Sequence, residues 1–146
     1  GTALVDVFEF DQRPAHTAAR VINLSTRATV GSGDDVLIGG FVIEGREKRD
    51  LLVRALGASL SQYGVAQPLA DSTLEIVDQR GQVVASNDDW NTDAAARAHF
   101  QAQTSLRPTD ATDAAALVSL APGTYTVIIR GKHGASGTAL AEVNTL

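Results

Sequence analysis

The sequence predicts an all-β fold, an antiparallel, jelly-roll-like β-sandwich of about nine or ten short strands with one short helix near residues 93–103. Short runs of β-branched and aliphatic residues recur at regular spacing, and Gly, Asp and Asn cluster between them as turn residues do. Only one alanine-rich stretch has a helix-forming composition. A chain of 146 residues can bury about 68–70% of its unfolded surface, so it needs no disulfide, and it contains no Cys.

Residues 1–10 predict an unusual first strand, because both of its faces are apolar. We interpret it as a donor-type strand that needs cover on both sides. Its apolar side chains are Ala3, Val5 and Val7 on one face and Leu4, Phe8 and Phe10 on the other. Residues 11–19 contain Pro14 and small polar residues and are predicted to be a linker. Residues 20–146 then form the predicted sandwich domain.

The next elements are predicted from β-prone composition and length. Residues 20–24 and 27–30 indicate two short strands. Residues 36–44 and 49–55 are aliphatic runs separated by a glycine-led, charged turn, which predicts a hairpin. Residues 58–63 are too few for a stable helix and predict a single helical turn.

A second hairpin is predicted over residues 73–78 and 82–86, which lie on either side of a Gln-Arg-Gly turn. Thr92 is the expected N-cap of the helix that runs from Asp93 to about Gln103. The alanine content of this stretch favours the helix, as does the acidic residue in its first turn.

The chain ends with a predicted strand at residues 114–120 and a final hairpin formed by residues 123–130 and 137–143. The last of these runs, Gly-Thr-Ala-Leu-Ala-Glu-Val, is nearly repeated at residues 1–7, which read Gly-Thr-Ala-Leu-Val-Asp-Val. Five of the seven positions are identical, and a sixth exchanges one acid for another. Residues 1–7 and 137–143 are therefore predicted to be two strands that suit the same kind of position in a sheet.

The composition limits the classes of partner. A formal net charge of -5 and an isoelectric point near 5.0 argue against nucleic acid, whose phosphates require clustered Lys and Arg. Cations are therefore the expected ligands. No run approaches the roughly 18 apolar residues of a membrane span, so no membrane insertion is expected. A chain that begins at Gly1 without Met is expected to have lost either a targeting segment, which would mean export, or an artificial leader.

The densest group of oxygen ligands is the run Asn87, Asp88 and Asp89, to which Asp110 and other loop carboxylates could be added. Calcium takes about six to eight hard oxygen ligands, often from adjacent loops. These four residues are therefore the candidate metal ligands, and calcium is the candidate cofactor. Their spacing does not match an EF-hand loop. The interpretation that we favour is that Asp and Asn occupy these positions because they suit turns and helix caps.

Little in the sequence points to catalysis. His16, His99 and His133 fall in a linker, a helix and a turn, without the spacing of a metal-binding pair. The sequence has no nucleophile elbow, phosphate loop or dinucleotide fingerprint, so we do not expect an enzyme; a metal-dependent hydrolase is the enzymatic alternative. Trp90 either anchors the helix onto the sandwich, which we favour, or stays exposed to stack on a sugar or a partner.

The second half of the sequence resembles a known family. Residues 71–143 contain, in order, Thr-Leu-Glu-Ile-Val-Asp, Gly-Gln-Val-Val-Ala-Ser-Asn-Asp-Asp, Leu-Ala-Pro-Gly-Thr-Tyr-Thr-Val-Ile-Ile-Arg-Gly and Gly-Thr-Ala-Leu. This order is similar to that of bacterial pre-peptidase C-terminal domains, which are extracellular β-sandwiches, and the chain also resembles repeat units of large secreted bacterial surface proteins. The resemblance implies a noncatalytic module, calcium-binding in some members, with Asn87, Asp88 and Asp89 at the matching positions. The extra strand copy at residues 1–7 departs from the family pattern.

Together these features predict a secreted structural protein, a subunit of an extracellular bacterial filament or surface layer. Residues 1–10 are expected to add as a strand to a neighbouring subunit, which gives a head-to-tail homopolymer. One alternative is that this strand belongs to a sheet of its own chain. Another is a monomeric extracellular binding module for carbohydrate or a protein surface, stabilised by calcium, that uses the loops around Asp88 and Trp90.

Overall fold

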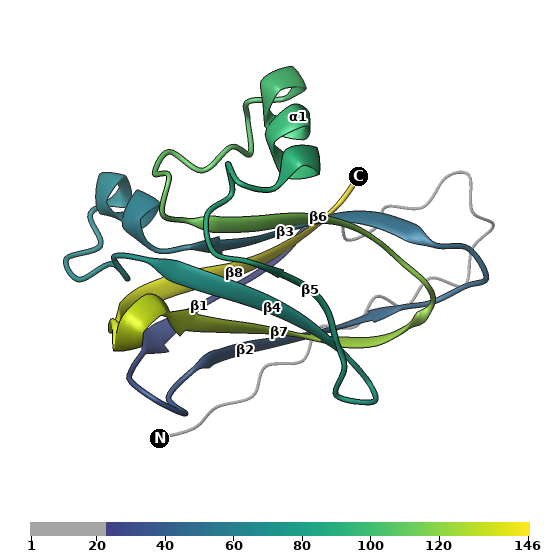
Figure 1. Ribbon diagram of the computed structural model, residues 1–146, viewed down its shortest axis with the longest axis horizontal. Coiled ribbons are helices and arrows are strands. Elements are labelled where there is room, and N and C mark those ends of the chain that lie inside the picture. The colour runs from purple at the N-terminus through teal and green to yellow at the C-terminus, as the bar shows by residue number, and fades with distance from the viewer. Residues whose placement is uncertain (1–22) are drawn as a thin grey trace.

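The computed structural model describes residues 23–146, which form two packed sheets of four antiparallel strands each (Figure 1). Sheet A has the order β1-β8-β3-β6, and its strands are β1 (Asn23–Val30), β3 (Arg49–Leu56), β6 (Ala114–Leu120) and β8 (Gly137–Thr145). Sheet B has the order β2-β7-β4-β5, and its strands are β2 (Leu37–Ile43), β4 (Ser72–Asp78), β5 (Val83–Asn87) and β7 (Gly123–Gly131). The predicted all-β sandwich is confirmed as a double-sheet jelly roll, with eight strands in the described part of the chain instead of nine or ten.

Three short helices complete the described residues: η1 (Ala58–Tyr63), α1 (Ala94–Ala102) and η2 (Lys132–Gly134). The helical turn predicted at residues 58–63 is confirmed as a 3₁₀ helix. The predicted N-cap of α1 is wrong. Asp93 caps the helix, because its Oδ1 accepts a hydrogen bond of 2.6 Å from the Ala96 amide. The Thr92 hydroxyl instead donates to the Asp89 carbonyl at 2.7 Å.

One of the predicted hairpins is confirmed. β4 and β5 pair directly in sheet B, and the turn between them is closed by two hydrogen bonds of 2.9 Å, from the Asp78 amide to Gln82 and from the Gly81 amide to Asp78. Gly81 has a φ of 78°, a left-handed conformation that favours glycine.

The two other predicted hairpins are wrong, because β2 and β3 lie in opposite sheets, as do β7 and β8. A glycine-containing connection between two strands looks the same in sequence whether the strands pair in one sheet or lie in opposite sheets. The turn sequence alone therefore does not identify a hairpin. The two short strands predicted at residues 20–24 and 27–30 are also corrected. From Asn23 to Val30 a single strand, β1, pairs without interruption along β8.

The main core lies between the two sheets and is built from alternate residues of their strands. Leu74 and Ile76 of β4, and Val127 and Ile129 of β7, are fully buried on the inner face of sheet B. A second, smaller cluster lies on the outer face of sheet A, where α1 covers β3 and β6 (Figure 1). Its buried members are Leu52, Ala96, Phe100 and Ala115.

The outer face of sheet A also holds a buried ion pair. Arg54 of β3 and Glu142 of β8 are direct neighbours across the two strands, and their side chains are 10% and 11% exposed. The guanidinium donates to the Glu142 carboxylate and to the Leu106 carbonyl, and Asn23 donates a hydrogen bond of 2.5 Å to the other carboxylate oxygen. This network joins β1, β3, β8 and the loop after α1.

Leu69 belongs to no strand, yet it is fully buried. Its amide donates to the Thr138 carbonyl at 2.8 Å, which attaches the segment between η1 and β4 to the beginning of β8. Three glycines allow this close approach. A Cβ atom would lie 3.0 Å from Leu69 Cβ at Gly57, 3.0 Å from Leu69 Cδ1 at Gly131 and 2.7 Å from the Leu69 amide nitrogen at Gly137. These contacts leave no room for a larger residue at the three positions.

Some predictions concern parts of the chain outside residues 23–146. The predicted donor-type strand at residues 1–10, with Ala3, Leu4, Val5, Val7, Phe8 and Phe10, and the linker at residues 11–19 lie outside the described residues. Within residues 23–146, no helix has both the length and the apolar character needed to cross a membrane.

Candidate functional site

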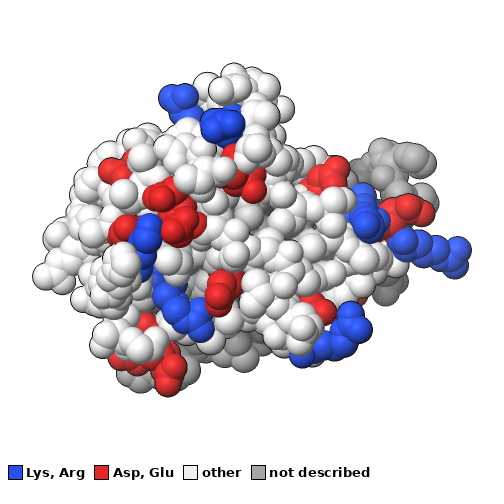
Figure 2. Space-filling model, in the orientation of Figure 1, with Lys and Arg blue, Asp and Glu red and all other residues white. Residues whose placement is uncertain are grey.

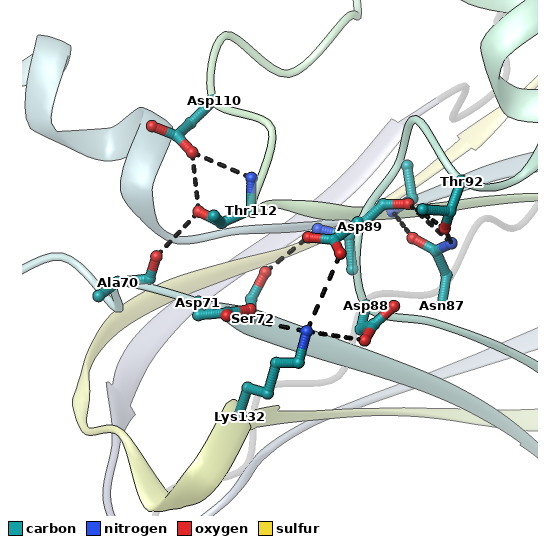
Figure 3. A network of polar contacts seen from close by, with 12 residues as sticks. Ala70, Asp71, Ser72, Asn87, Asp88, Asp89, Thr92, Asp110, Thr112 and Lys132 are labelled. Carbon is teal, nitrogen blue, oxygen red and sulfur yellow. Dashed lines mark hydrogen bonds and ion pairs between the residues drawn. The ribbon is translucent and has the colours of Figure 1, made fainter.

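Asp88 and Asp89, two of the predicted calcium ligands, lie with Asp71 at one end of sheet B, where β4 begins, β5 ends and β7 passes into η2. Asp71 immediately precedes β4, and Asp88 and Asp89 immediately follow β5. Ser72 pairs with Gly131 and Leu74 with Asn87, so the three strand ends lie side by side. η2 then places Lys132 among the acids (Figure 3).

The Lys132 ammonium lies between three carboxylates (Figure 3). Its Nζ is 2.9 Å from Asp88 Oδ2, 3.9 Å from Asp89 Oδ2 and 4.0 Å from Asp71 Oδ2. We call these four residues the Lys132 cluster. All four side chains are partly exposed, so water screens the attraction and each ion pair contributes little to stability on its own.

Within the Lys132 cluster, Asp88 and Lys132 shift each other's pKa. The hydrogen bond from Lys132, followed by its charge, holds the pKa of Asp88 below 3.8, although burial acts in the opposite direction. The same hydrogen bond raises the pKa of Lys132 above 10.5, and the charges of Asp71, Asp88 and Asp89 add to it. Asp88 and Lys132 therefore both stay charged across the neutral pH range.

The backbone fixes Lys132 in this position. Its amide donates a 3.0 Å hydrogen bond to the Asp71 carbonyl. Asp71 therefore contacts Lys132 twice, through its backbone oxygen and through its carboxylate, which faces the ammonium. His133, the next residue, has a φ of 54° and Gly134 a φ of 77°, which turn the chain back toward β8. The lysine side chain is thus held at the edge of the acids by a tight turn.

Asn87 has a structural role instead. Its Oδ1 accepts a 3.0 Å hydrogen bond from the Ala115 amide, and its Nδ2 donates to the Asp89 carbonyl at 3.1 Å. These contacts attach the end of β5 to β6 of the opposite sheet. The amide oxygen that was predicted to bind a metal is therefore engaged by the backbone.

Asp110 lies apart from the Lys132 cluster (Figure 3). Its Oδ1 accepts hydrogen bonds from the Thr112 amide at 3.0 Å and the Thr112 hydroxyl at 2.7 Å, and these bonds lower its pKa below 3.8. The Ala70 carbonyl oxygen lies 2.9 Å from the same hydroxyl and shares its single proton with Asp110. Asp110 thus shapes the loop before β6.

The four predicted calcium ligands do not form one ligand shell. Asp88 and Asp89 face an ammonium, Asn87 faces β6, and Asp110 binds its own loop. Among residues 23–146, no group of three or more His, Asp or Glu side chains is arranged to hold a metal ion. The residues therefore do not fit calcium as they stand, since the lysine nitrogen takes the central place.

Trp90 anchors the helix, in agreement with the interpretation favoured from the sequence. Its ring meets Phe100 of α1 edge-on, with 5.4 Å between ring centroids, and its Nε1 donates to the Asp110 carbonyl at 2.9 Å. The half-buried indole joins α1 to the outer face of sheet A. Both the ring and its donor are engaged within the fold, which leaves the sugar-stacking alternative without support.

A shallow, open groove of about 410 Å³ runs along sheet B beside the Lys132 cluster. It is lined by Thr73, Leu74, Glu75, Ser86, Asn87, Asp88, Thr92 and Arg130. Arg130 and Glu75 pair across it at 2.7 Å, so its principal charges are already partnered. Figure 2 shows acidic and basic side chains interspersed on this face, with no field of a single sign.

Sequence reasoning missed the buried carboxylate of Asp113, just before β6. Both carboxylate oxygens accept backbone hydrogen bonds, at 2.7 Å from Gly57 and 3.2 Å from Ser59, which fix the start of η1. Burial raises the pKa of Asp113 above 3.8, and these bonds only partly oppose it. A single Asp in a polar loop gives no signal of burial in the sequence.

Asp113 is expected to make stability fall with increasing pH. Because its folded-state pKa is raised, its contribution is complete below about pH 3.8 and is lost as the pH rises through the folded-state value. Urea unfolding from about pH 3 to 7 should show the wild type losing stability relative to Asp113→Asn as pH rises.

Asp110→Asn is the matched control for this prediction, because the pKa of Asp110 is lowered. Asp110 contributes stability that is present above its unfolded pKa and lost as the pH falls through its folded value, so its difference curve should slope the opposite way. Parallel curves for the two variants would show that Asp113 does not titrate as its burial requires.

Comparison with known proteins identifies the fold. No protein-family model and no curated protein sequence matches this chain. Among solved structures, the chain is similar to the pre-peptidase C-terminal domain of a collagenase from Bacillus anthracis, with a TM-score of 0.51 and 14% sequence identity over 92% of this chain and 100% of that domain. The sandwich therefore has the fold of a pre-peptidase C-terminal domain, the family that residues 71–143 resemble.

Proposed function

We propose that this protein is an exported, noncatalytic structural module that joins copies of itself end to end. In this proposal, residues 1–10 of one copy add as an extra strand to the outer edge of β2 in the next copy. The observation that carries the proposal is the near repetition of β8 at residues 1–7. Export is supported by the likeness to a pre-peptidase C-terminal domain and by the motifs within residues 71–143.

The position of β8 explains what the repeated segment is suited to do. β8 is an interior strand that pairs with β1 on one side and β3 on the other. Ala139 and Ala141 face the core, while Glu142 faces outward to Arg54. Residues 1–7 keep this alternation and keep an acid at the place of Glu142. They therefore have the side chains of a strand that is paired and covered.

The edge of β2 offers a place for such a strand. Among residues 23–146, β2 pairs with β7 alone. Ile38 and Val42 on its outer face are 60% and 62% exposed, which gives this edge an apolar surface. An added strand would place Leu4, Phe8 and Phe10 beside these two side chains.

The inner side of the same edge also lacks cover from residues 23–146. Thr26 and Ala28 of β1 pair with Ala141 and Ala139, so they point toward the interior, yet both are exposed. β1 lies across the sandwich from β2, where Gly39 faces Thr26. A fifth strand beside β2 would cover this gap with Ala3, Val5 and Val7. The two apolar faces of residues 1–10 thus each have a matching surface.

The energetics favour occupation of this edge. Burying the large apolar side chains of residues 1–10 contributes on the order of 10 kcal/mol before ordering costs, at about 1.5–3 kcal/mol for each one. Main-chain hydrogen bonds to the edge add affinity. Because the donor segment and the acceptor edge are different surfaces, the contact does not close on itself and builds a filament.

A monomeric binding module is the second candidate, and the groove along sheet B favours it. Its polar lining, with Asp88, Ser86 and Arg130, offers donors and acceptors to a carbohydrate or a peptide. A glycan array probed with the monomeric protein tests this candidate. Binding that is lost in Ser86→Lys would favour the module over the filament.

The assembly proposal is tested by sedimentation velocity and negative-stain microscopy of four proteins at one concentration. These are the intact chain, a chain lacking residues 1–10, Ile38→Lys/Val42→Lys, and Val83→Lys. Val83 is 55% exposed on β5, at the opposite edge of sheet B, so its substitution makes the same chemical change away from the acceptor edge.

We expect filaments from the intact chain and Val83→Lys, and monomers from the other two. A monodisperse intact chain at high concentration would contradict assembly. If that monomer also lost stability when residues 1–10 were removed, the strand would belong to its own chain. Filaments that persisted in Ile38→Lys/Val42→Lys would contradict the choice of the β2 edge.

A further inference from the structure

We propose that the Lys132 ammonium is a built-in substitute for a divalent cation, so that Asp71, Asp88 and Asp89 are held together without metal. The proposal concerns the end of sheet B and is independent of how the chain assembles. It follows from the disagreement between the calcium that the family resemblance implies and the residues that occupy the site.

The geometry is that of three carboxylates arranged around an ammonium nitrogen. Asp71 and Asp88 come from segments on either side of the β4–β5 hairpin, and Lys132 reaches them from η2. The three nearest carboxylate oxygens lie 2.9–4.0 Å from Nζ. A calcium ion needs carboxylate oxygens at about 2.3–2.6 Å, so it cannot share this position with the ammonium. Lysine and metal are therefore alternative occupants.

Asp71 retains unused capacity as a ligand. Its Oδ1 is buried and has no hydrogen-bond partner within residues 23–146, and its Oδ2 is at the longest of the three distances from Nζ. A buried carboxylate oxygen without a partner is unfavourable, and a cation with several coordination sites would satisfy it better than one ammonium. The ammonium leaves the carboxylate charge of the cluster only partly neutralised.

The lysine has one advantage over a metal ion, which is that it is always present. Its amide is bonded to the Asp71 carbonyl, so folding itself delivers the ammonium to the acids. Stabilisation by a bound ion depends on the ion concentration, whereas a tethered cation acts at any concentration. The wild-type fold is therefore expected to be insensitive to calcium and to chelators.

Removing the ammonium should convert the cluster into a calcium-dependent site. Lys132→Met keeps an unbranched apolar stem but leaves three carboxylates without a counter-charge, so they repel one another. The matched control is Lys48→Met, because Lys48 is the only other lysine of the chain and is exposed in the turn between β2 and β3. The full-length proteins are compared by thermal unfolding in EDTA and in millimolar CaCl₂, with NaCl added to equal ionic strength.

We expect CaCl₂ to raise the Tm of Lys132→Met by about 3 °C or more in a saturable manner, and to leave the wild type and Lys48→Met unchanged. Adding Asp88→Asn to Lys132→Met should remove the response. If Lys132→Met is unfolded in EDTA, circular dichroism should show that CaCl₂ refolds it. Failure of CaCl₂ to stabilise or refold Lys132→Met, or an equal response in the wild type, would overturn the proposal.

Discussion

Replacing Glu142 by Gln is expected to lower the free energy of unfolding by about 3–5 kcal/mol, because the change leaves Arg54 buried without its counter-charge. The guanidinium would keep its bond to the Leu106 carbonyl, but a neutral amide cannot balance the charge. Arg54 Nε already lacks a hydrogen-bond partner in the described part of the chain, so no bond at this nitrogen would offset the lost ion pair. Urea unfolding at neutral pH measures the loss.

Glu75→Gln is the control for this measurement. Glu75 pairs with Arg130 of the neighbouring strand, diagonally and not directly opposite, and these side chains are 39% and 44% exposed. An exposed pair contributes about 0–1 kcal/mol, so this variant should lose little. The double variant Arg54→Met/Glu142→Gln should recover part of the loss, because it removes the unpaired charge. Equal losses for Glu142→Gln and Glu75→Gln would show that the buried network does not hold sheet A together.

Leu69→Ala is expected to destabilise the protein by about 2–5 kcal/mol, the range for truncating a fully buried leucine. The cavity would form between η1, η2 and the start of β8, where the glycines at 57, 131 and 137 have no side chains to refill it. The segment between η1 and β4 should then open more readily, so amide hydrogen exchange at Leu69 and Thr138 should accelerate with the loss of stability.

Tyr63→Ala provides the comparison, since Tyr63 is a large, exposed side chain at the end of η1. Its removal should change the free energy of unfolding by about 0.5 kcal/mol or less. A loss below about 1 kcal/mol for Leu69→Ala would mean that the segment can collapse onto the sandwich, and that Leu69 is not a core residue.

The sequence was most informative where local chemistry is decisive. Alternation of apolar residues indicated β4, and residues 114–120 were predicted with the bounds that β6 has. The turn after Asp78 identified a true hairpin, because a short glycine turn holds both of its strands together. Alanine content located α1, while its cap was misplaced by one residue, since Thr92 and Asp93 both favour an N-cap.

The pairing of distant strands was beyond local patterns. The turn that contains Gly45 and the segment from Gly131 to Gly137 looked like hairpin connections, yet both carry the chain from one sheet to the other. Which strand lies beside β8 depends on contacts between residues about a hundred positions apart, such as Asn23 with Asn144. Only the packing of the two sheets selects among such partners.

The candidate functional site was likewise predictable from the sequence only in part. The sequence identified Asp88 and Asp89 as part of a charged cluster, but it could not reveal that Lys132, more than forty residues later, supplies the cation. It gave no sign that Asp113 and Glu142 are buried, since a carboxylate in a loop or strand is usually solvated.

By itself the sequence determined an acidic, cysteine-free β-sandwich whose final strand is nearly repeated at residues 1–7. These properties follow from composition and from a period of two residues, which act along the chain. The tertiary structure alone shows the jelly-roll order, the place of β2 at the edge of sheet B within residues 23–146, and the place of Lys132 among the acids. Each of these depends on which surfaces meet when the two sheets close over a common core, and that outcome is set by long-range packing.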